Sequence, residues 1–463
     1  MNEEKKLKKV LSNFDLLFLA LGAMLGWGWV VLSGSWITSA GSFGAVVAFI
    51  IGGMLVIFVG LNYAELASAM PKVGGEHAYV HRALGNNMSF VASWAITLGY
   101  ISVATFEAVA LPTVINFLMP DYEAGYLWTV AGFDVHLNWV LIGSVGALII
   151  TVINYIGVKQ AAAMQTFLTL MIVGVGLLLI FGAGLNGDPS NLSPFFIEGS
   201  GGIMAVLVMV PFLFVGFDVI PQVAEEANLP KKQIGKLLIF SVLAAVIFYL
   251  AIALGVGLGL NQSQLASTEL ATADAMASLF GSQFFAQLLI VGGVAGIITS
   301  WNSFIIGGSR VLYAMAESRM IPAWFGKIHP KYHTPSNSIL FIGILSMLAP
   351  LLGESALIWI VDAGGLGIVA AYFLVALSFI VLRKKEPDME RPFRAAKSPI
   401  FGYLAIILSF GFILLYMPSM PAALLWPYEW IMVAGWTLLG VFFFINMRRG
   451  VYEEKSADKK EAL

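Results

Sequence analysis

The sequence predicts an all-α integral membrane protein with twelve transmembrane helices. Hydrophobic residues make up 59% of the chain and charged residues only 11%, and apolar runs of about 20 residues recur along it. Such runs form helices, because lipid offers free backbone groups no hydrogen-bonding partner. The expected spans are approximately 13–40, 43–69, 88–118, 138–156, 161–185, 200–227, 234–260, 283–318, 337–353, 356–382, 400–418 and 424–446.

The distribution of basic residues predicts the orientation. All 25 lysines and arginines can be placed on one side of a membrane, at the termini and in every second turn. The intervening turns, which have no Lys or Arg, lie near 41, 119–138, 186–200, 261–283, 353 and 418–429. Basic residues are retained in the cytoplasm during insertion, so we expect a multi-pass protein of the cell membrane with both termini cytoplasmic.

Composition excludes several classes of protein. A net charge of −2 gives no indication of nucleic-acid binding. The absence of cysteine excludes disulfides, thiolate metal sites, cysteine catalysis and a disulfide-linked subunit. The stretches between spans are too short for a soluble domain, so we do not expect an enzyme. The first apolar run is too long for a cleaved signal peptide, and the polar residues 453–463 are expected to form a mobile tail.

Glycines interrupt the first span. Gly22, Gly26 and Gly28 lie within seven residues of one another, in the run LGAMLGWGW. Each weakens a helix by about 1 kcal/mol relative to alanine. Close helix packing is the alternative explanation, because small residues let backbones approach.

The sixth span is interrupted at a corresponding place. Pro211 and Pro221 bracket Gly216 and the intramembrane carboxylate of Asp218. Spans 1 and 6 are equivalent if spans 1–5 and 6–10 are repeats, the second inserted upside down. Interrupted segments at matching positions in two halves are a sequence pointer to a transporter's midplane binding site.

The two interruptions indicate a receptor for a zwitterion. A helix that restarts at Gly26–Gly28 presents free N–H groups, which suit a carboxylate. Half-helices that end there offer free carbonyls, which suit an ammonium group or a sodium ion. An amine would use only the second of these two poles.

At these residues the chain resembles the amino acid–polyamine–organocation (APC) superfamily of secondary transporters. Five ordered blocks over most of the chain carry the resemblance. They are Gly22–Gly28 in span 1, the FLFVGFD run 212–218 with Glu225 and Glu226, Tyr63–Leu66 with Pro71–Glu76, Ser309–Ala316, and Arg391–Arg394.

The resemblance implies a five-plus-five inverted repeat, interrupted in spans 1 and 6, with two peripheral helices. The units would be a cytoplasmic N-terminus (1–12), the repeats (13–185 and 200–382), spans 11–12 (400–446) and a cytoplasmic tail (447–463). It also implies alternating access around a central amino-acid or amine site, without a cofactor, as an antiporter or a symporter. Membrane lipids are the other expected partner, and the oligomeric state stays open.

The resemblance also implies the site. The substrate carboxylate would meet N–H groups of Leu25, Gly26, Trp27 and Gly28, and its ammonium would meet carbonyls near Ala23, Phe212, Leu213 and Val215. Met24 and Gly216 complete the two breaks, Phe214 would be the aromatic gate, and Trp301 would be a wall. Trp27 departs from the family's small or hydroxylic residue. It either points away from the site or narrows the pocket and favours a small substrate.

Glu107 lies near the middle of span 3, and no family motif requires it. A carboxyl that is withdrawn from water can carry a proton or bind a cationic amine. The alternative is a neutral carboxyl that forms hydrogen bonds between helices.

Other intramembrane acids have structural or gating interpretations. Glu65 is expected to order a gate as part of the scaffold, and Asp218 to brace the unwound backbone. Glu225 and Glu226 are expected to pair with nearby basic loops at the cytoplasmic mouth. Asp362 is either solvated or part of an outer gate.

The coupling ion is left open by the sequence. Thr299 and Ser300 in span 8 can help bind sodium, or can bond to their own helix. Proton coupling through Glu107 and uncoupled exchange are the alternatives. The interior lysine of some proton-coupled relatives, expected near Met171 or Ile172, is absent, and no firm metal site is predicted.

Transport of amino acids or related small amines is therefore the expected function. One alternative is a polyamine or amine carrier that uses Glu107 as the cation partner. An alternative of another class is a membrane-embedded amino-acid sensor that binds its ligand without moving it.

Overall fold

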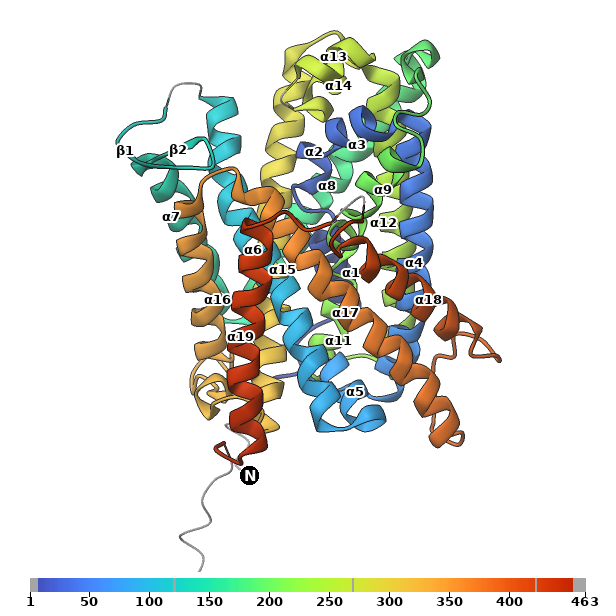
Figure 1. Cartoon of the computed structure of the whole chain (residues 1–463), viewed down its shortest axis with the longest axis vertical. Helices are drawn as coiled ribbons and strands as arrows, with labels where there is room; N and C mark the ends of the chain where they lie inside the picture. The colour runs from blue at the N-terminus through green and yellow to red at the C-terminus, as the bar shows by residue number, and fades with distance from the viewer. Residues whose placement is uncertain (1–6, 120–121, 269, 421–422, 453–463) are drawn as a thin grey trace, which may run out of the picture.

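A computed structural model describes residues 7–119, 122–268, 270–420 and 423–452 of this protein. Most of the described chain forms helices that run along the longest axis of the molecule (Figure 1). The predicted tail at 453–463 and the first six residues of the predicted N-terminal unit lie outside the described residues.

Two of the spans are divided, as the sequence predicts. Span 1 consists of α1 (Asn13–Met24), α2 (Gly28–Val31) and α3 (Ser33–Ala40), and span 6 of α9 (Ser200–Leu207), α10 (Val210–Phe214) and α11 (Val219–Gln222). The remaining spans are α4 (Ser42–Ala69), α6 (Asn86–Leu118), α7 (Leu137–Ile156), α8 (Val158–Asn186), α12 (Lys231–Gly259), α15 (Gln283–Glu317), α16 (Ser336–Leu348), α17 (Ala356–Lys385), α18 (Ile400–Leu415) and α19 (Tyr428–Arg448).

Ten of these segments in the described chain are long and apolar enough to cross a membrane, where the sequence predicts twelve. The two shorter ones are α16, with 13 residues, and α18, with 16. At about 1.5 Å per residue, both fall short of a hydrocarbon core of about 30 Å. Pro350 explains the first case: the α-helix gives way there to a 3₁₀ turn, η5 (Ala349–Leu352), because proline cannot donate the backbone bond.

The bundle has two chemically different ends. One end of the bundle carries α5 (Glu76–Leu84) and the C-terminal end of α17 (Figure 1), and with them Arg82 and the basic residues 383–385; we call it the basic end. Four short elements lie there: α5 (Glu76–Leu84), η3 (Ala224–Glu226), η4 (Ala323–Gly326) and the start of α12.

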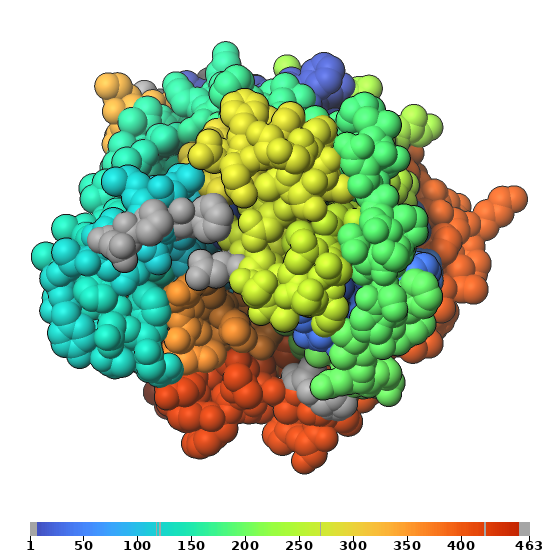
Figure 2. Space-filling view, turned by 90° about the horizontal axis from the view of Figure 1, so that it is seen from above, coloured from blue at the N-terminus to red at the C-terminus, as the bar shows by residue number. Residues whose placement is uncertain are grey.

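The opposite end carries its own short elements. They are the hairpin of β1 (Tyr126–Val130) and β2 (Phe133–His136), η2 (Pro189–Leu192), α13 (Gln262–Ser267) and α14 (Ala271–Phe280). The strands are antiparallel, with Thr129 opposite Asp134. Seen from this end, α13 and α14 (yellow) lie over the middle of the bundle, between the hairpin and the segment around η2 (Figure 2).

Helix packing follows a pattern of paired contacts. The most extensive interfaces among the first ten spans join α6 with α17, α4 with α12, α6 with α15, α15 with α8, and α7 with α16, and α17 also packs extensively against α18. The first broken span packs through α1 against α8, α12 and α15, and the second packs through α10 against α17 and α4. Both broken spans therefore lie inside the bundle, whereas α18 and α19 pack mainly against α17 at its side.

Candidate functional site

The two interruptions touch each other in the middle of the bundle. α1 ends at Met24 and α2 begins at Gly28, while the chain between α10 and α11 passes through Gly216 at a φ of +134°. A methyl group built on Gly216 would lie 2.6 Å from Ala23 Cβ and 3.0 Å from the Met24 nitrogen. Only glycine fits this backbone and this crossing.

A small cavity lies at this crossing. It has a volume of about 20 Å³, which is room for a single water-sized molecule. Six of its lining residues are predicted substrate-binding residues: Ala23, Met24, Gly26, Gly28, Phe212 and Leu213. The others are Val103, Phe106, Glu107, Tyr249, Ser300 and Phe304. Binding of an amino acid therefore requires the broken spans to separate.

The remaining predicted binding residues are buried but do not line this cavity. Leu25, Val215 and Gly216 contribute to the two breaks. The ring of Phe214 packs against Tyr249 at 5.0 Å and Phe49 at 6.1 Å, to one side of the cavity. Trp301 lies beside Gly146 of α7, also away from it. The Phe106 and Phe212 rings, which do line the cavity, lie 5.4 Å apart in edge-to-face contact.

Trp27 points away from the cavity. A methyl group built on Gly293 of α15 would lie 2.1 Å from Cζ3 of the Trp27 ring, so this glycine provides the space for the indole. Trp27 is buried, and the neighbouring Trp29 stacks edge-on against Phe248 at 5.4 Å. Of the two alternatives left by the sequence, the structure favours the one in which Trp27 does not narrow the pocket.

The backbone groups at the first break are already partly occupied. The Leu25 N–H donates to the Leu21 carbonyl at 2.8 Å, which extends α1 by one bond. The Trp27 N–H lies against the Glu107 carboxyl. The Met24 carbonyl accepts a bond of 2.8 Å from the Tyr249 hydroxyl. Leu25 is therefore not free to donate to a substrate, and Trp27 donates to the protein's own acid.

Glu107 lies in the cavity wall, directly opposite the first break. A methyl group built on Gly26 would lie 2.7 Å from Glu107 Oε1 and 2.8 Å from Ser300 Cβ, so Gly26 is held between two side chains. Glu107 is buried, and its Oε2 atom has no hydrogen-bond partner in the described part of the chain. A carboxyl thus occupies the N-terminal end of α2, where the sequence places the carboxylate of a substrate.

Hydroxyl and amide groups surround α1 next to the cavity. Thr299 donates to the Gly296 carbonyl of its own helix at 3.1 Å, and Ser303 donates to the Leu19 carbonyl of α1 at 3.1 Å. From α8, Gln165 donates to Ser303 at 2.9 Å and Thr169 to the Phe18 carbonyl at 3.2 Å. Among the described residues, no group of three or more His, Cys, Asp or Glu side chains forms a metal site.

The α8 residues that contact α1 precede the position at which the resemblance places an interior lysine, Met171 or Ile172. A methyl group built on Gly22 would lie close to Gln165 Nε2, six or seven residues before that position, and to Thr169 Oγ1, two or three residues before it. The register could not be read from the sequence, because it depends on where α8 crosses α1. Both contacting residues are uncharged.

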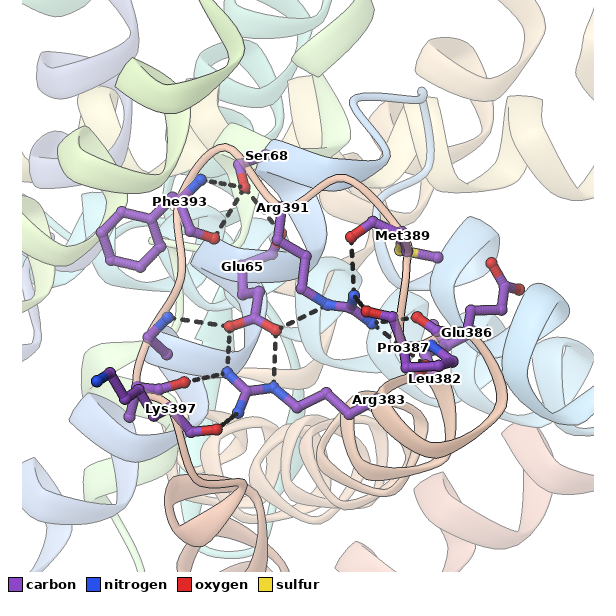
Figure 3. Close-up of polar contacts among 12 residues, drawn as sticks. Glu65, Ser68, Leu382, Arg383, Glu386, Pro387, Met389, Arg391, Phe393 and Lys397 are labelled. Carbon is purple, nitrogen blue, oxygen red and sulfur yellow. Dashed lines mark hydrogen bonds and ion pairs between the residues drawn. The ribbon is translucent and has the colours of Figure 1, made fainter.

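Glu65 forms a buried ion-pair cluster at the basic end (Figure 3). Its carboxylate accepts a bond of 2.9 Å from Arg383 Nε and forms an ion pair of 3.1 Å with Arg391 Nε. It also accepts a bond of 2.9 Å from the Ala395 N–H. These contacts tie α4 to α17 and to the loop that follows it.

The other acids occupy different positions around the site. Asp218 is buried and accepts a bond of 2.8 Å from the Gly216 N–H, so it touches the backbone of the second break. Glu226 pairs with Arg310 of α15, with both side chains 1% exposed and the closest atoms 2.8 Å apart. This partner lies on a spanning helix rather than on a loop, and Glu225 is exposed. Asp362 lies next to Glu429 of α19.

Larger cavities lie beyond the site, and two of them lie toward the two ends of the bundle. At the opposite end, a cavity of about 360 Å³ is lined by residues that include Val31, Phe106, Met209 and Asp362. Because Phe106 also lines the central cavity, this ring separates the two spaces. At the basic end, a surface cavity of about 600 Å³ is lined by Lys72, His77, Glu225 and their neighbours, but by no residue of the central cavity.

Sequence reasoning missed four lining residues. Val103, Phe106, Tyr249 and Phe304 lie on continuous helices, where no break marks them. Tyr249 carried a usable signal, because a phenol in an apolar span needs a hydrogen-bond partner and here finds the free Met24 carbonyl.

Comparisons with known proteins agree with the resemblance. The sequence model described as "Amino acid permease" matches residues 11–444. The chain is 30% identical to the branched-chain amino acid permease BcaP of Bacillus subtilis, over 87% of each chain. It is 26% identical to the methylthioribose transporter of the same species, over 97% of this chain and 95% of that one. It is 28% identical to the vacuolar cationic amino acid transporter 4 of Arabidopsis thaliana, over 83% of this chain and 64% of that one. The family and these relatives are transporters rather than enzymes, and the chain belongs to the amino acid permease family, within the APC superfamily.

Proposed function

We propose that this protein is a secondary active transporter that moves amino acids across the cell membrane by alternating access. The contact of Gly216 with Ala23 carries the proposal, because it joins two interrupted helices beside one small cavity. Interrupted helices that meet inside a bundle are the arrangement in which transporters bind substrate. The family match and the permease relatives support the same class.

The packing of the helices supports the five-plus-five inverted repeat, with units 13–185 and 200–382. When each span of the first half is exchanged with the span five places later, and the reverse, every main helix–helix contact among the first ten spans maps onto an observed contact. The α4–α12, α6–α15 and α7–α16 interfaces map onto themselves, and α6–α17 maps onto α15–α8. The packing of α1 on α8 likewise maps onto that of α10 on α17. In this scheme α18 and α19 are the peripheral helices.

The surroundings of the cavity support a zwitterionic substrate. Backbone groups at Gly26 and Gly28 are the candidates for its carboxylate, as a helix restarts there. Carbonyls near Ala23, Phe212, Leu213 and Val215 are the candidates for its ammonium. Branched-chain and cationic amino acids appear in the names of the relatives, so both belong among the substrates to test.

Alternating access requires different closures on the two sides of the site. Toward the opposite end, we assign the closure to a single ring contact, between Phe106 and Phe212. Toward the basic end, we assign it to several contacts, including the ion pairs of Glu65 and Glu226. Because basic residues are retained in the cytoplasm, we assign the basic end and both termini to the cytoplasm. The conformation is then closed to the cytoplasm.

For coupling we propose a proton carried by Glu107. The carboxyl lines the cavity, touches the Trp27 N–H, and has one free oxygen in the described chain. A sodium ion at Thr299 and Ser300 is the weaker candidate, because Thr299 is already bonded to its own helix. Exchange without a coupling ion is the third mode.

A carrier for a cationic amine is the second candidate function. The free Oε2 of Glu107 favours it, because a buried carboxylate beside the cavity can pair with an ammonium group. The methylthioribose transporter among the relatives shows that members of similar sequence also carry substrates other than amino acids.

A binding screen followed by uptake tests the proposal. The purified protein would be heated with each of the twenty amino acids and with putrescine, spermidine and methylthioribose, and each stabilising compound would be loaded onto proteoliposomes. Stabilisation and uptake of an amino acid are expected. Stabilisation by polyamines alone would favour the amine carrier, and binding without uptake would favour the sensor.

The same proteoliposomes test which ion gradient, if any, drives uptake. Uptake with a proton gradient, a sodium gradient, both or neither separates the three modes. Glu107→Gln is expected to remove the effect of the proton gradient while the protein still binds substrate. Unchanged pH dependence in this variant would exclude Glu107 from coupling.

A further inference from the structure

A second buried acid pair lies at the basic end, outside the central cavity. Glu76 is the first residue of α5, a short helix between spans, yet it is fully buried. Gln222, the last residue of α11, donates from Nε2 to both Glu76 oxygens, at 2.8 and 2.6 Å. The Gly74 N–H also donates to the Gln222 carbonyl at 3.4 Å. Glu76 thus binds the end of the second broken span.

Asp218 is the second member of the pair. It begins α11 and accepts a bond from the Gly216 N–H at 2.8 Å. Tyr100 of α6 lies next to it and accepts a bond of 3.3 Å from the same Gln222 amide. The two acids are therefore connected through Gln222 and Tyr100, and each touches one end of α11.

Among the described residues, the side chains next to the two carboxyls are phenols and the Gln222 amide. Phenols face them from four elements: Tyr63 of α4, Tyr79 of α5, Tyr100 of α6 and Tyr372 of α17. No Lys or Arg in the described chain forms an ion pair with Glu76 or Asp218, and Arg310 is engaged by Glu226. The adjacent His77 turns the other way, toward Ser93 and Ser318, at 3.1 and 2.7 Å.

Two buried carboxylates without a base are costly, and a proton removes most of that cost. Burial, followed by the nearby Asp218 carboxyl, raises the pKa of Glu76 well above its usual range. Two acceptor atoms next to it, Gln222 Oε1 and Asp218 Oδ2, are buried without a hydrogen-bond donor in the described chain. The phenols of Tyr63, Tyr79 and Tyr372 are neutral donors and leave both carboxylate charges in place, whereas a proton on one carboxyl removes one of these charges.

We propose that Glu76 and Asp218 form a proton-binding site that holds the basic end of the transporter closed. The inference rests on the proposed alternating access, but the site is separate from Glu107 and from the substrate cavity. With one proton bound, the pair bridges α5 and α11 through Gln222. When the proton leaves, two negative charges repel in a dry environment, and α11 separates from α5.

The direction of the pH effect follows from this scheme. The closed state binds the proton more tightly than the open state, in which water reaches both acids. Low pH therefore favours the closed basic end. As the pH rises toward the pKa of the closed pair, the fraction of open protein increases by up to about tenfold per pH unit for one proton.

Cysteine labelling can measure this opening, because the chain has no native cysteine. Val219 of α11 is fully buried against α15, where its Cγ2 would lie 3.2 Å from a methyl group built on Gly307. Val219→Cys would be labelled with a maleimide at several pH values in purified protein. The labelling rate of Val219→Cys would be divided by the labelling rate of Lys331→Cys, an exposed position at the same end. This ratio removes the pH dependence of the thiol itself.

The expected result is a normalised labelling rate that rises with pH in the Val219→Cys background. Adding Glu76→Gln should keep the rate low at every pH, because glutamine imitates the protonated acid. Adding Glu225→Gln, which changes an exposed acid at the same end, should leave the pH dependence intact. Equal pH dependence with and without Glu76→Gln would overturn the proposal.

A second measurement covers the case in which Glu76→Gln does not fold. Hydrogen exchange of segments 70–84 and 216–227 in the unmodified protein, corrected for the intrinsic pH dependence, should accelerate with pH. Protection that does not change with pH would also overturn the proposal. Neither the labelling assay nor the exchange assay contains substrate, so both test the proton site even if the transport screen fails. The Glu76→Gln variant is expected to bind amino acids as the unmodified protein does.

Discussion

The two ends of the bundle are closed by different kinds of contact. At the basic end, buried polar groups join several helices: Glu65 binds Arg383 and Arg391, Glu226 binds Arg310, and Glu76 binds Gln222. At the opposite end, the central cavity is separated from a space of about 360 Å³ by the Phe106 ring and its contact with Phe212.

The difference indicates how the transporter is built to move. A buried ion pair is sensitive to geometry. If one partner moves away and no water replaces it, the other partner is left as an uncompensated buried charge. The basic end is therefore expected to open in one cooperative step. The contact at the opposite end joins only two side chains, Phe106 and Phe212, so that end is expected to open locally.

The largest effect is expected where the ion pair is most buried. Arg310→Met leaves Glu226 as an unpaired buried charge, which costs about 3 to 5 kcal/mol. Thermal unfolding of the purified protein should shift downward by several degrees. The double variant Arg310→Met/Glu226→Leu removes both charges and should recover most of the loss. A double variant no more stable than Arg310→Met would contradict the ion-pair explanation.

A smaller effect is expected in the cluster of Figure 3. Arg391→Gln leaves Glu65 paired with Arg383, so the loss in unfolding free energy should be about 1 to 2 kcal/mol. The loop that follows α17 should then exchange backbone hydrogens faster than in the unmodified protein. Arg394→Gln, in the same loop, is the matched control. Equal exchange in both variants would show that Arg391 does not hold the loop.

At the opposite end, the ring contact should govern access more than stability. Phe106→Leu keeps most of the buried volume and should cost about 1 kcal/mol. A cysteine at Ser300, which lines the central cavity, should nevertheless be labelled faster in this variant. An unchanged labelling rate would mean that Phe106 does not close the path.

The smallest effect is expected at Asp362. It lies next to Glu429, another acid, at the edge of the outer cavity. Asp362→Asn keeps the size and the hydrogen-bonding capacity of the side chain, so unfolding should change by less than about 0.5 kcal/mol. A loss comparable to that of Arg310→Met would show that the opposite end also depends on charge.

The two helix breaks could be predicted because local sequence determines them. The glycines of span 1 and the prolines and glycine of span 6 mark both breaks, which form at Leu25–Trp27 and Val215–Asp218. A carboxyl in the middle of span 3 could be recognised as exceptional, and Glu107 does line the cavity.

The remainder depends on residues that are distant in sequence. Trp27 turns away from the cavity because Gly293, far along the chain, leaves space for its ring. Phe212 lines the cavity and Phe214 does not, because the Phe214 ring packs against Phe49 and Tyr249. Glu76 is the first residue of a short helix between spans, where an acid is expected to be solvated, yet it is buried and bound to Gln222 of α11.

Replacing Gly26 with alanine tests most directly whether the crossing of the broken spans is the substrate site. A methyl group there would lie 2.7 Å from Glu107 Oε1 and 2.9 Å from Ser300 Oγ, and so would fill the cavity. Gly184→Ala, in α8, is the matched control, because a methyl group there meets no atom within 4 Å. Uptake of the stabilising amino acid into proteoliposomes should be abolished by Gly26→Ala and unchanged by Gly184→Ala. Normal uptake by a folded Gly26→Ala protein would contradict the assignment of the site.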